Sequence, residues 1–219
     1  MDGEPARSLL ALDEITRRLR RDCPWDREQD ERSIVPHTVE EAYELADAAN
    51  SGDDAKMLDE LGDVLFQVYF LSLLLEERGQ GDLAAVAEHC RQKLIRRHPH
   101  VFGDAQAEDA ATVLRNWDEI KRTEPGRDAD AVFHDVPENL PSLLYARKLL
   151  RRAASRSDFE HPDPDRLRRR LRERLEDDSF EAIGEILFDC VALARDAGVD
   201  PELALRAAAD RFRKAIDDR

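Results

Sequence analysis

Two groups of acidic residues, spaced for one face of a helix, stand out in the first third of the chain. The first group reads Glu40-Glu41-x-x-Glu44, and the second reads Glu60-x-x-Asp63. Residues three positions apart lie about 60° apart around a helix axis, so their side chains are neighbours. Glu41 and Glu44 therefore share one helix face, and Glu60 and Asp63 share another.

The segment between the two groups predicts a tight turn. Gly52 is a C-cap signal for the first helix, and Asp53 can cap the second. The two helices become antiparallel neighbours, so four carboxylates can converge on one groove. Without cations they would repel one another and raise one another's pKa, whereas Mg²⁺ or Mn²⁺ is well suited to hard oxygen ligands. One acidic motif alone is usually a solvated helix face, but two motifs flanking a turn favour a metal site.

A smaller set of basic and aromatic residues can offset the charge of an anionic ligand. Lys93 and Arg97 are four residues apart and share a helix face, and so do Trp117 and Lys121. Arginine can bind phosphate through two parallel hydrogen bonds, and an indole can stack on a nucleobase. Each such residue alone is more often an ordinary surface cation or a core tryptophan. The full set is Lys56, Lys93, Arg96, Arg97, Trp117 and Lys121.

Composition limits the class of protein that these residues can serve. The formal net charge of −15 argues against a surface that binds nucleic acid. The 3 cysteines are far apart and contain no Cys-x-x-Cys, which fits a reducing cytoplasm rather than a disulfide framework or zinc site. The N-terminus does not resemble a signal peptide, and no apolar run is long enough to cross a membrane.

Apolar residues recur at helical spacing throughout, and no segment alternates like a strand, so we expect an all-α fold. A polar, proline-containing stretch over residues 124–141 separates two halves. The expected helices cover about Leu9–Leu19, a segment from near Thr38 to Ala49, Ala55–Arg78, Leu83–Arg97, Ala110–Thr123, Leu143–Arg156, and three further segments, the last opened by Asp200-Pro201.

The segment from Leu12 to about Glu124 resembles the MazG nucleoside triphosphate pyrophosphohydrolases. The resemblance rests on Cys23-Pro24-Trp25-Asp26, the two acidic motifs, the stretch Lys93–Phe102, and Trp117-x-x-Ile120-Lys121, in that order. It implies a MazG-like helical bundle of two related repeats that forms a homodimer through four-helix-bundle packing. It also implies Mg²⁺-dependent hydrolysis of nucleoside triphosphates to monophosphate and pyrophosphate, as in nucleotide-pool house-cleaning.

The resemblance also implies roles for individual residues. Metal ligation would fall on Glu41, Glu44, Glu60 and Asp63, and nucleotide contacts on Lys56, Lys93, Arg97 and Trp117, with Arg96 and Lys121 as further candidates. Either Glu40 or Glu41 can be the general base, and the sequence does not choose between attack at the α and β phosphorus.

The second half looks like a degenerate copy of the first. Ala182–Phe188 resembles Glu60–Phe66, but Ala182 replaces the Glu and Glu185 replaces the Asp. Arginines from Arg168 to Arg172 stand where the first acidic motif is expected, and arginine repels a divalent cation. We therefore predict a MazG-like catalytic repeat over residues 1–124, a linker over 125–141, and a degenerate repeat over 142–219.

Two other functions remain open at this point. A narrower enzyme acting on one deoxynucleotide, such as dUTP or dCTP, would share the acidic residues. A non-catalytic helical adaptor or regulatory protein would use the basic stretches of the second half to bind a partner. A ferritin-like di-iron bundle is excluded because the chain contains no Glu-x-x-His.

Overall fold

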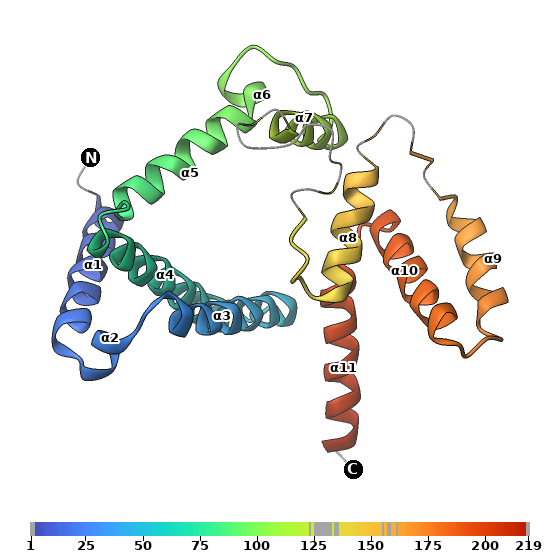
Figure 1. Ribbon diagram of the computed structural model, residues 1–219, viewed down its shortest axis with the longest axis horizontal. Coiled ribbons are helices and arrows are strands. Elements are labelled where there is room, and N and C mark those ends of the chain that lie inside the picture. Colours follow the sequence, from blue (N-terminus) through green and yellow to red (C-terminus); the bar gives the residue numbers. More distant parts are fainter. Residues whose placement is uncertain are drawn as a thin grey trace. The chain divides into compact units, whose positions relative to one another are not determined.

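The computed structural model describes residues 3–122, 124, 133, 136–154, 156, 159–160 and 162–217, and every regular element in these ranges is a helix (Figure 1). The all-α prediction is therefore confirmed. The helices are α1 (Glu4–Asp22), α2 (Pro24–Glu28), α3 (Glu31–Ser51), α4 (Asp54–Glu77), α5 (Leu83–Arg97), α6 (Pro99–Phe102), α7 (Ala110–Arg122), α8 (Ser142–Ala153), α9 (Pro164–Arg174), α10 (Phe180–Asp196) and α11 (Pro201–Asp217).

Helix α3 begins well before the predicted start near Thr38, so that prediction is wrong. The helix is started by a capping box, in which the Asp30 carboxylate accepts from the Ser33 backbone N–H at 2.9 Å and the Ser33 hydroxyl accepts from the Asp30 N–H at 2.9 Å. Pro36 lies inside the helix and removes one backbone donor. The helix that this capping box starts therefore continues past Pro36, although proline usually interrupts a helix.

Two short helices, α2 and α6, occupy segments for which the sequence predicted no helix. Each has a proline at its first position, Pro24 and Pro99. Proline is favoured there because its fixed backbone angle suits a helix and its missing N–H would have no partner in the first turn. The same residue type that ends one helix thus begins the next.

The chain forms two compact units, residues 1–96 and 97–219. The predicted linker over 125–141 lies outside the described residues except for 133 and 136–141. The predicted boundaries of the two repeats therefore remain predictions. No helix in the described part of the chain is long and apolar enough to span a bilayer.

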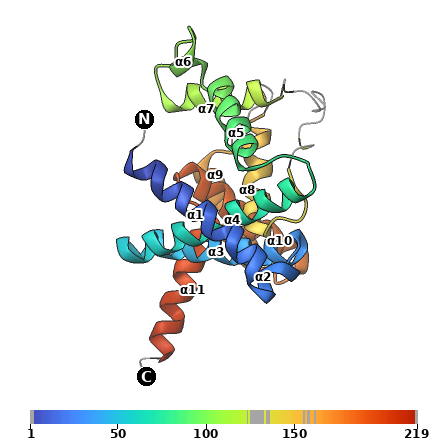
Figure 2. The same cartoon turned by 90° about the vertical axis from the view of Figure 1, so that its left-hand side faces the viewer.

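In the first unit, α3 and α4 form an antiparallel hairpin, and they lie side by side in both views (Figure 1, Figure 2). Ile34, Phe70 and Leu74 form its buried core, with Phe66 and Leu71 packed against them. Phe70 is 0% exposed, so the centre of α4 is anchored by a fully buried aromatic ring.

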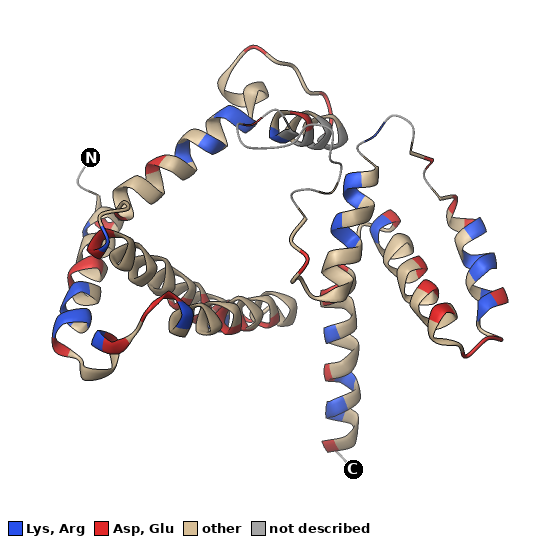
Figure 3. Ribbon diagram, in the orientation of Figure 1, with Lys and Arg blue, Asp and Glu red and all other residues tan. Residues whose placement is uncertain are grey.

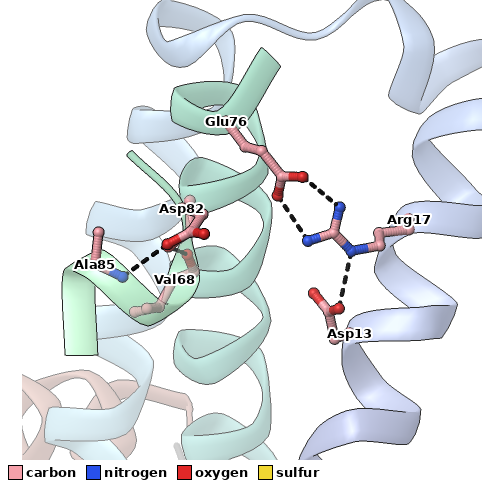
Figure 4. Close-up of polar contacts among 7 residues, drawn as sticks. Asp13, Arg17, Val68, Glu76, Asp82 and Ala85 are labelled. Atoms are coloured by element: carbon pink, nitrogen blue, oxygen red, sulfur yellow. Dashed lines mark hydrogen bonds and ion pairs between the residues drawn. The ribbon is translucent and has the colours of Figure 1, made fainter. Parts of the chain in front are cut away.

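Helix α1 is fastened to the end of α4 by two arginines. Arg17 donates two hydrogen bonds to Glu76, at 3.0 and 2.6 Å, and a third to Asp13 at 2.8 Å (Figure 4). These hydrogen bonds raise the pKa of Arg17. Arg20 binds both oxygens of Glu77 at 2.8 Å. Paired two-bond contacts of this kind fix the direction of one helix against another.

In the second unit, α8, α9 and α11 each pack against α10. The buried core contains Leu150, Leu167, Val191 and Ala192. Helix α11 begins as predicted at Asp200-Pro201, because the Asp200 carboxylate accepts from the backbone N–H groups of the next turn at 3.0 and 3.1 Å.

Candidate metal centre

The hairpin of α3 and α4 is built around a left-handed glycine. Gly52 has φ 71°, a conformation that glycine adopts without steric cost, and it ends α3. Asp53 then caps α4 by accepting from the N–H groups of Ala55 and Lys56, both at 3.0 Å. The turn therefore reverses the chain where the sequence predicted, and it brings the two acidic motifs face to face.

Three carboxylates meet across this hairpin. One oxygen each of Glu41, Glu60 and Asp63 lies within 4.8 Å of the other two. Glu41 is half-buried, Glu60 is only 5% exposed, and Asp63 is exposed. Elsewhere in the described ranges, no other trio of His, Cys, Asp or Glu side chains comes this close together. We call these three residues the acidic cluster.

The electrostatics of the acidic cluster are those of crowded like charges. Burial raises the pKa of Glu41, and the charges of Asp63, Glu44, Glu60 and Glu40 raise it further. Burial also raises the pKa of Glu60, as does the charge of Glu44. Repulsion of this kind costs free energy in the absence of a cation, because each carboxylate makes ionisation of the others less favourable.

The chemistry of these ligands fits a hard divalent cation. Carboxylate oxygens at this separation can share one ion, and an exposed member such as Asp63 leaves room for waters and for phosphate oxygens. Glu44 is exposed and lies outside the closest trio, but its charge acts on both Glu41 and Glu60. The predicted four ligands therefore appear as three that meet and one neighbour.

The other predicted residues of this unit lie near the hairpin or on α5. Glu40 is exposed, with an oxygen 3.6 Å from Nδ1 of His37. Lys56 is exposed in the first turn of α4. Its positive charge lowers the pKa of Glu60, whereas burial and the neighbouring carboxylates raise it. Lys93 is half-buried on α5 and Arg96 is exposed.

The second unit brings together the remaining predicted residues. The Arg97 guanidinium carbon lies 5.2 Å from the ring centroid of Trp117, and the Lys121 ammonium lies 5.5 Å from it. Arg97 also binds both oxygens of Glu124, at 2.9 and 2.5 Å. The sequence did not identify Glu124, or Arg151 of α8, whose guanidinium carbon is 5.2 Å from the same ring. Neither residue has a motif spacing that relates it to Trp117.

The second half has arginine–carboxylate pairs where the first half has its acidic cluster. Arg170 and Arg174 of α9 both pair with Asp189 of α10, and Arg174 also pairs with Glu185. Figure 3 shows how basic residues, all of them arginine, recur along α9. Asp189 is 2% exposed, and its charge is neutralised by the guanidinium groups of two arginines that stay partly exposed. These pairs leave little reason for a cation to bind there.

Taken together, the described parts define an all-helical protein with a cation-compatible acidic cluster on a helical hairpin. Residues 29–102, which include that hairpin, match the MazG nucleotide pyrophosphohydrolase domain.

Similar proteins match over most of the chain. A nucleoside triphosphate pyrophosphohydrolase of Escherichia coli K12 is 35% identical, over 94% of this chain and 83% of its own length. A protein of Thermotoga maritima named nucleoside triphosphate pyrophosphohydrolase/pyrophosphatase MazG is 36% identical, over 87% and 76%. A nucleoside triphosphate pyrophosphohydrolase of Mycobacterium tuberculosis is 31% identical, over 76% of this chain and 51% of its own length. The chain belongs to the MazG family, which confirms the predicted family and the prediction of a pyrophosphohydrolase enzyme.

Proposed function

We propose that this protein hydrolyses nucleoside triphosphates to nucleoside monophosphate and pyrophosphate with the help of Mg²⁺, for which Mn²⁺ can substitute. The observation that carries the proposal is the meeting of Glu41, Glu60 and Asp63 within 4.8 Å, on the segment that matches the family domain. The names of the similar proteins support the substrate class.

Glu41, Glu60 and Asp63 would hold the cation, with Glu44 beside them as a fourth ligand or a neighbouring charge. When bound, Mg²⁺ supplies positive charge against the phosphate oxygens as negative charge develops on them. The half-buried, crowded position of Glu41 supports this assignment, because a cation removes the repulsion that otherwise raises its pKa.

A carboxylate of the first motif would accept the proton of the attacking water. A bond then forms between the water oxygen and phosphorus, the α–β anhydride bond breaks, and pyrophosphate leaves. Glu41 has the raised pKa that suits a proton acceptor, whereas Glu40 is more exposed and so more accessible to water. Both remain candidates for the general base.

The basic residues would bind and neutralise the triphosphate. We assign this role to Lys56, Lys93, Arg96, Arg97 and Lys121, and we assign the nucleobase contact to Trp117. Arg97 is the least direct candidate for this role, because its Nε and Nη2 atoms already donate hydrogen bonds to Glu124. A phosphate would have to compete with that carboxylate or bind through the remaining nitrogen.

The second half, over residues 142–219, would be a degenerate repeat that supports the catalytic repeat over 1–124. The pairing of Arg170 and Arg174 with Asp189 supports this interpretation, because guanidinium groups neutralise the buried carboxylate. We further propose a cytoplasmic house-cleaning role in which unwanted nucleotides are removed from the pool.

An exposed apolar stripe on α4 supports a homodimer. Leu58, Leu61, Leu65 and Val68 are between 36% and 75% exposed, and their spacing of three and four residues is that of a helix-packing seam. Two copies of the α3–α4 hairpin would bury this stripe in a four-helix bundle. Replacing Leu58 and Leu65 with Glu should convert the dimer to a monomer in light scattering, and an unchanged mass would contradict this arrangement.

The direct test is a substrate panel of standard, deoxy and damaged triphosphates with Mg²⁺, in which monophosphate and pyrophosphate are measured separately. Glu60→Gln and Asp63→Asn should each lower turnover by about 100-fold or more, while Glu14→Gln on α1 should not. Turnover of a single deoxynucleotide would favour the narrower enzyme. Absence of pyrophosphate release from every substrate would favour an adaptor, and full turnover by a folded Asp63→Asn variant would refute the site assignment.

A further inference from the structure

A groove lined mainly by arginine lies where α1 and α2 pack near the end of α4. Its volume is about 540 Å³, which is within the range of pockets that bind small molecules. The lining consists of Arg17, Arg20 and Arg21 of α1, Arg27 of α2, and Leu73 and Glu77 of α4. All of these residues belong to the first compact unit, and Figure 3 shows basic residues near the end of α1 and on α2. Four guanidinium groups and one carboxylate therefore line one groove, in a chain whose formal net charge is −15.

Two of the four arginines form a fixed wall of this groove. Arg17 donates two hydrogen bonds to Glu76, at 3.0 and 2.6 Å. Arg20 binds both oxygens of Glu77 and also donates to two backbone carbonyl groups at and just after the end of α2. The side chain of Arg20 is only 18% exposed. These two charges are paired and their positions are fixed, so they shape the groove but do not supply its available donors.

The other two arginines have donors available for a ligand. The hydrogen bond from Arg21 to Asp22 uses only Nε, at 3.1 Å, and both side chains are more than half exposed. Across the described ranges, the side chain of Arg27 makes no hydrogen bond or ion pair, and it is exposed in the last turn of α2. The chain has 49 acidic and 34 basic residues, so carboxylates are not scarce. Available guanidinium groups beside a groove therefore favour an anion from outside the chain.

We propose that Arg21 and Arg27 bind the phosphate group of a nucleotide-sized phosphomonoester in this groove. Two guanidinium forks can each donate a pair of parallel hydrogen bonds to the oxygens of one phosphate dianion. The volume sets the size of the ligand, because a phosphate ion alone would fill only a small part of the groove. A planar base can stack on a guanidinium face, and Leu73 supplies an apolar contact. A nucleic acid strand fits less well, because the acidic bulk of the chain repels it.

This site is separate from the acidic cluster and does not depend on the proposed function. The helical rise of about 1.5 Å per residue separates Leu73 and Glu77 from Asp63 by about 15–21 Å along α4. A phosphate bound in the groove is therefore not the phosphate on which a cation at the acidic cluster would act. None of the four arginines has a role in the proposed hydrolysis, so the ligand is an effector rather than the substrate.

Isothermal titration calorimetry with adenosine monophosphate, in EDTA and at constant ionic strength, tests the site. We expect saturable binding that Arg27→Ala weakens about tenfold, because charge-assisted hydrogen bonds are lost. Arg21→Ala should have a similar effect, and Arg27→Lys, which keeps the charge but loses the fork, should lie between Arg27→Ala and the wild type. Arg27→Ala should fold normally, because within the described ranges its side chain has no partner to lose. Circular dichroism checks the fold.

Arg18→Ala is the matched control. Arg18 is on α1 and 78% exposed, but it does not line the groove, so its loss should change the affinity less than about twofold. Equal losses in Arg18→Ala and Arg27→Ala would mean that general electrostatics governs binding, and this would overturn the proposal. An unchanged affinity in folded Arg27→Ala protein would also overturn it. So would a loss confined to Lys93→Ala, which would locate the ligand at the substrate residues.

Inorganic phosphate, titrated in the same way, tests the size of the ligand. An affinity at least about tenfold weaker than that of adenosine monophosphate supports a nucleotide-sized ligand, whereas equal affinities would overturn that assignment. A separate assay of pyrophosphate release distinguishes this site from the proposed function. Arg27-dependent binding without hydrolysis would support the site alone, and hydrolysis without Arg27-dependent binding would support the proposed function alone.

Discussion

The charge of Asp63 offers the most informative single test of the acidic cluster. Its oxygen lies within 4.8 Å of one on Glu41, and after burial its charge is the largest cause of the raised pKa of Glu41. Asp63→Asn keeps the size of the side chain and removes the charge. In the metal-free protein this change should relieve repulsion, so the variant should be more stable than the wild type.

The magnitude follows from the separation and the exposure. Two unit charges 4.8 Å apart repel by about 1 kcal/mol in a water-like medium and by about 3.5 kcal/mol at an effective dielectric constant of about 20. Because Asp63 is exposed, solvent screening favours the lower value, about 1 kcal/mol. For a chain of this size, about 1 kcal/mol corresponds to a rise in Tm of about 2–4 °C.

Added Mg²⁺ should reverse the order of the two proteins. At about 100 times its dissociation constant a ligand stabilises the folded state by about 2.7 kcal/mol, or about 5–10 °C here. The variant lacks one carboxylate ligand and should gain much less. The assay is thermal unfolding by circular dichroism, first in EDTA and then across a Mg²⁺ series.

Glu14→Gln is the control for this experiment, because it removes the same charge from an exposed position on α1. It should change Tm by about 1–2 °C at most and keep the full response to Mg²⁺. A variant Asp63→Asn that melts below the wild type in EDTA, or that retains the complete Mg²⁺ response, would refute the reasoning.

Three further predictions concern pH and packing. The pKa values of Glu41 and Glu60 are raised above 4.5, so their contribution to the stability of the metal-free protein is present below pH 4.5 and is lost as the pH rises through the raised values. The affinity for Mg²⁺, measured by calorimetry, should weaken as the pH falls toward these raised pKa values, because protonated carboxyl groups bind the cation poorly. An affinity that does not change with pH would contradict this prediction. Phe70→Ala should lower the free energy of unfolding in urea by about 3–5 kcal/mol, since the ring is fully buried, and a loss below about 1 kcal/mol would argue against this core. Arg20→Ala should lower the free energy of unfolding by about 1.5–3 kcal/mol, because the pairing of Arg20 with Glu77 of α4 is lost. Arg18→Ala should lower it little, because the side chain of Arg18 is 78% exposed. Equal losses in the two variants would show that the pairing of Arg20 with α4 does not hold α1 in place.

Local rules predicted most of the helices correctly and failed where two rules competed. The helix spanning Asp54–Glu77 and the helix opened by Asp200-Pro201 follow from apolar periodicity and a capping residue. The start of α3 was missed because the capping box at Asp30 prevails over Pro36. The short helices α2 and α6 were missed because a proline at N1 can begin a helix as well as end one.

For the candidate site, the sequence determined which carboxylates face one another. The spacing within Glu60-x-x-Asp63 and the glycine turn at Gly52 are local features, and helix geometry converts them into positions with little freedom. Tertiary structure alone decided the rest. It buried Glu60 to 5% exposure, left Glu44 outside the closest trio, and paired Arg97 with a glutamate 27 residues away. Contacts between distant segments depend on how whole helices pack, and no spacing rule encodes that packing.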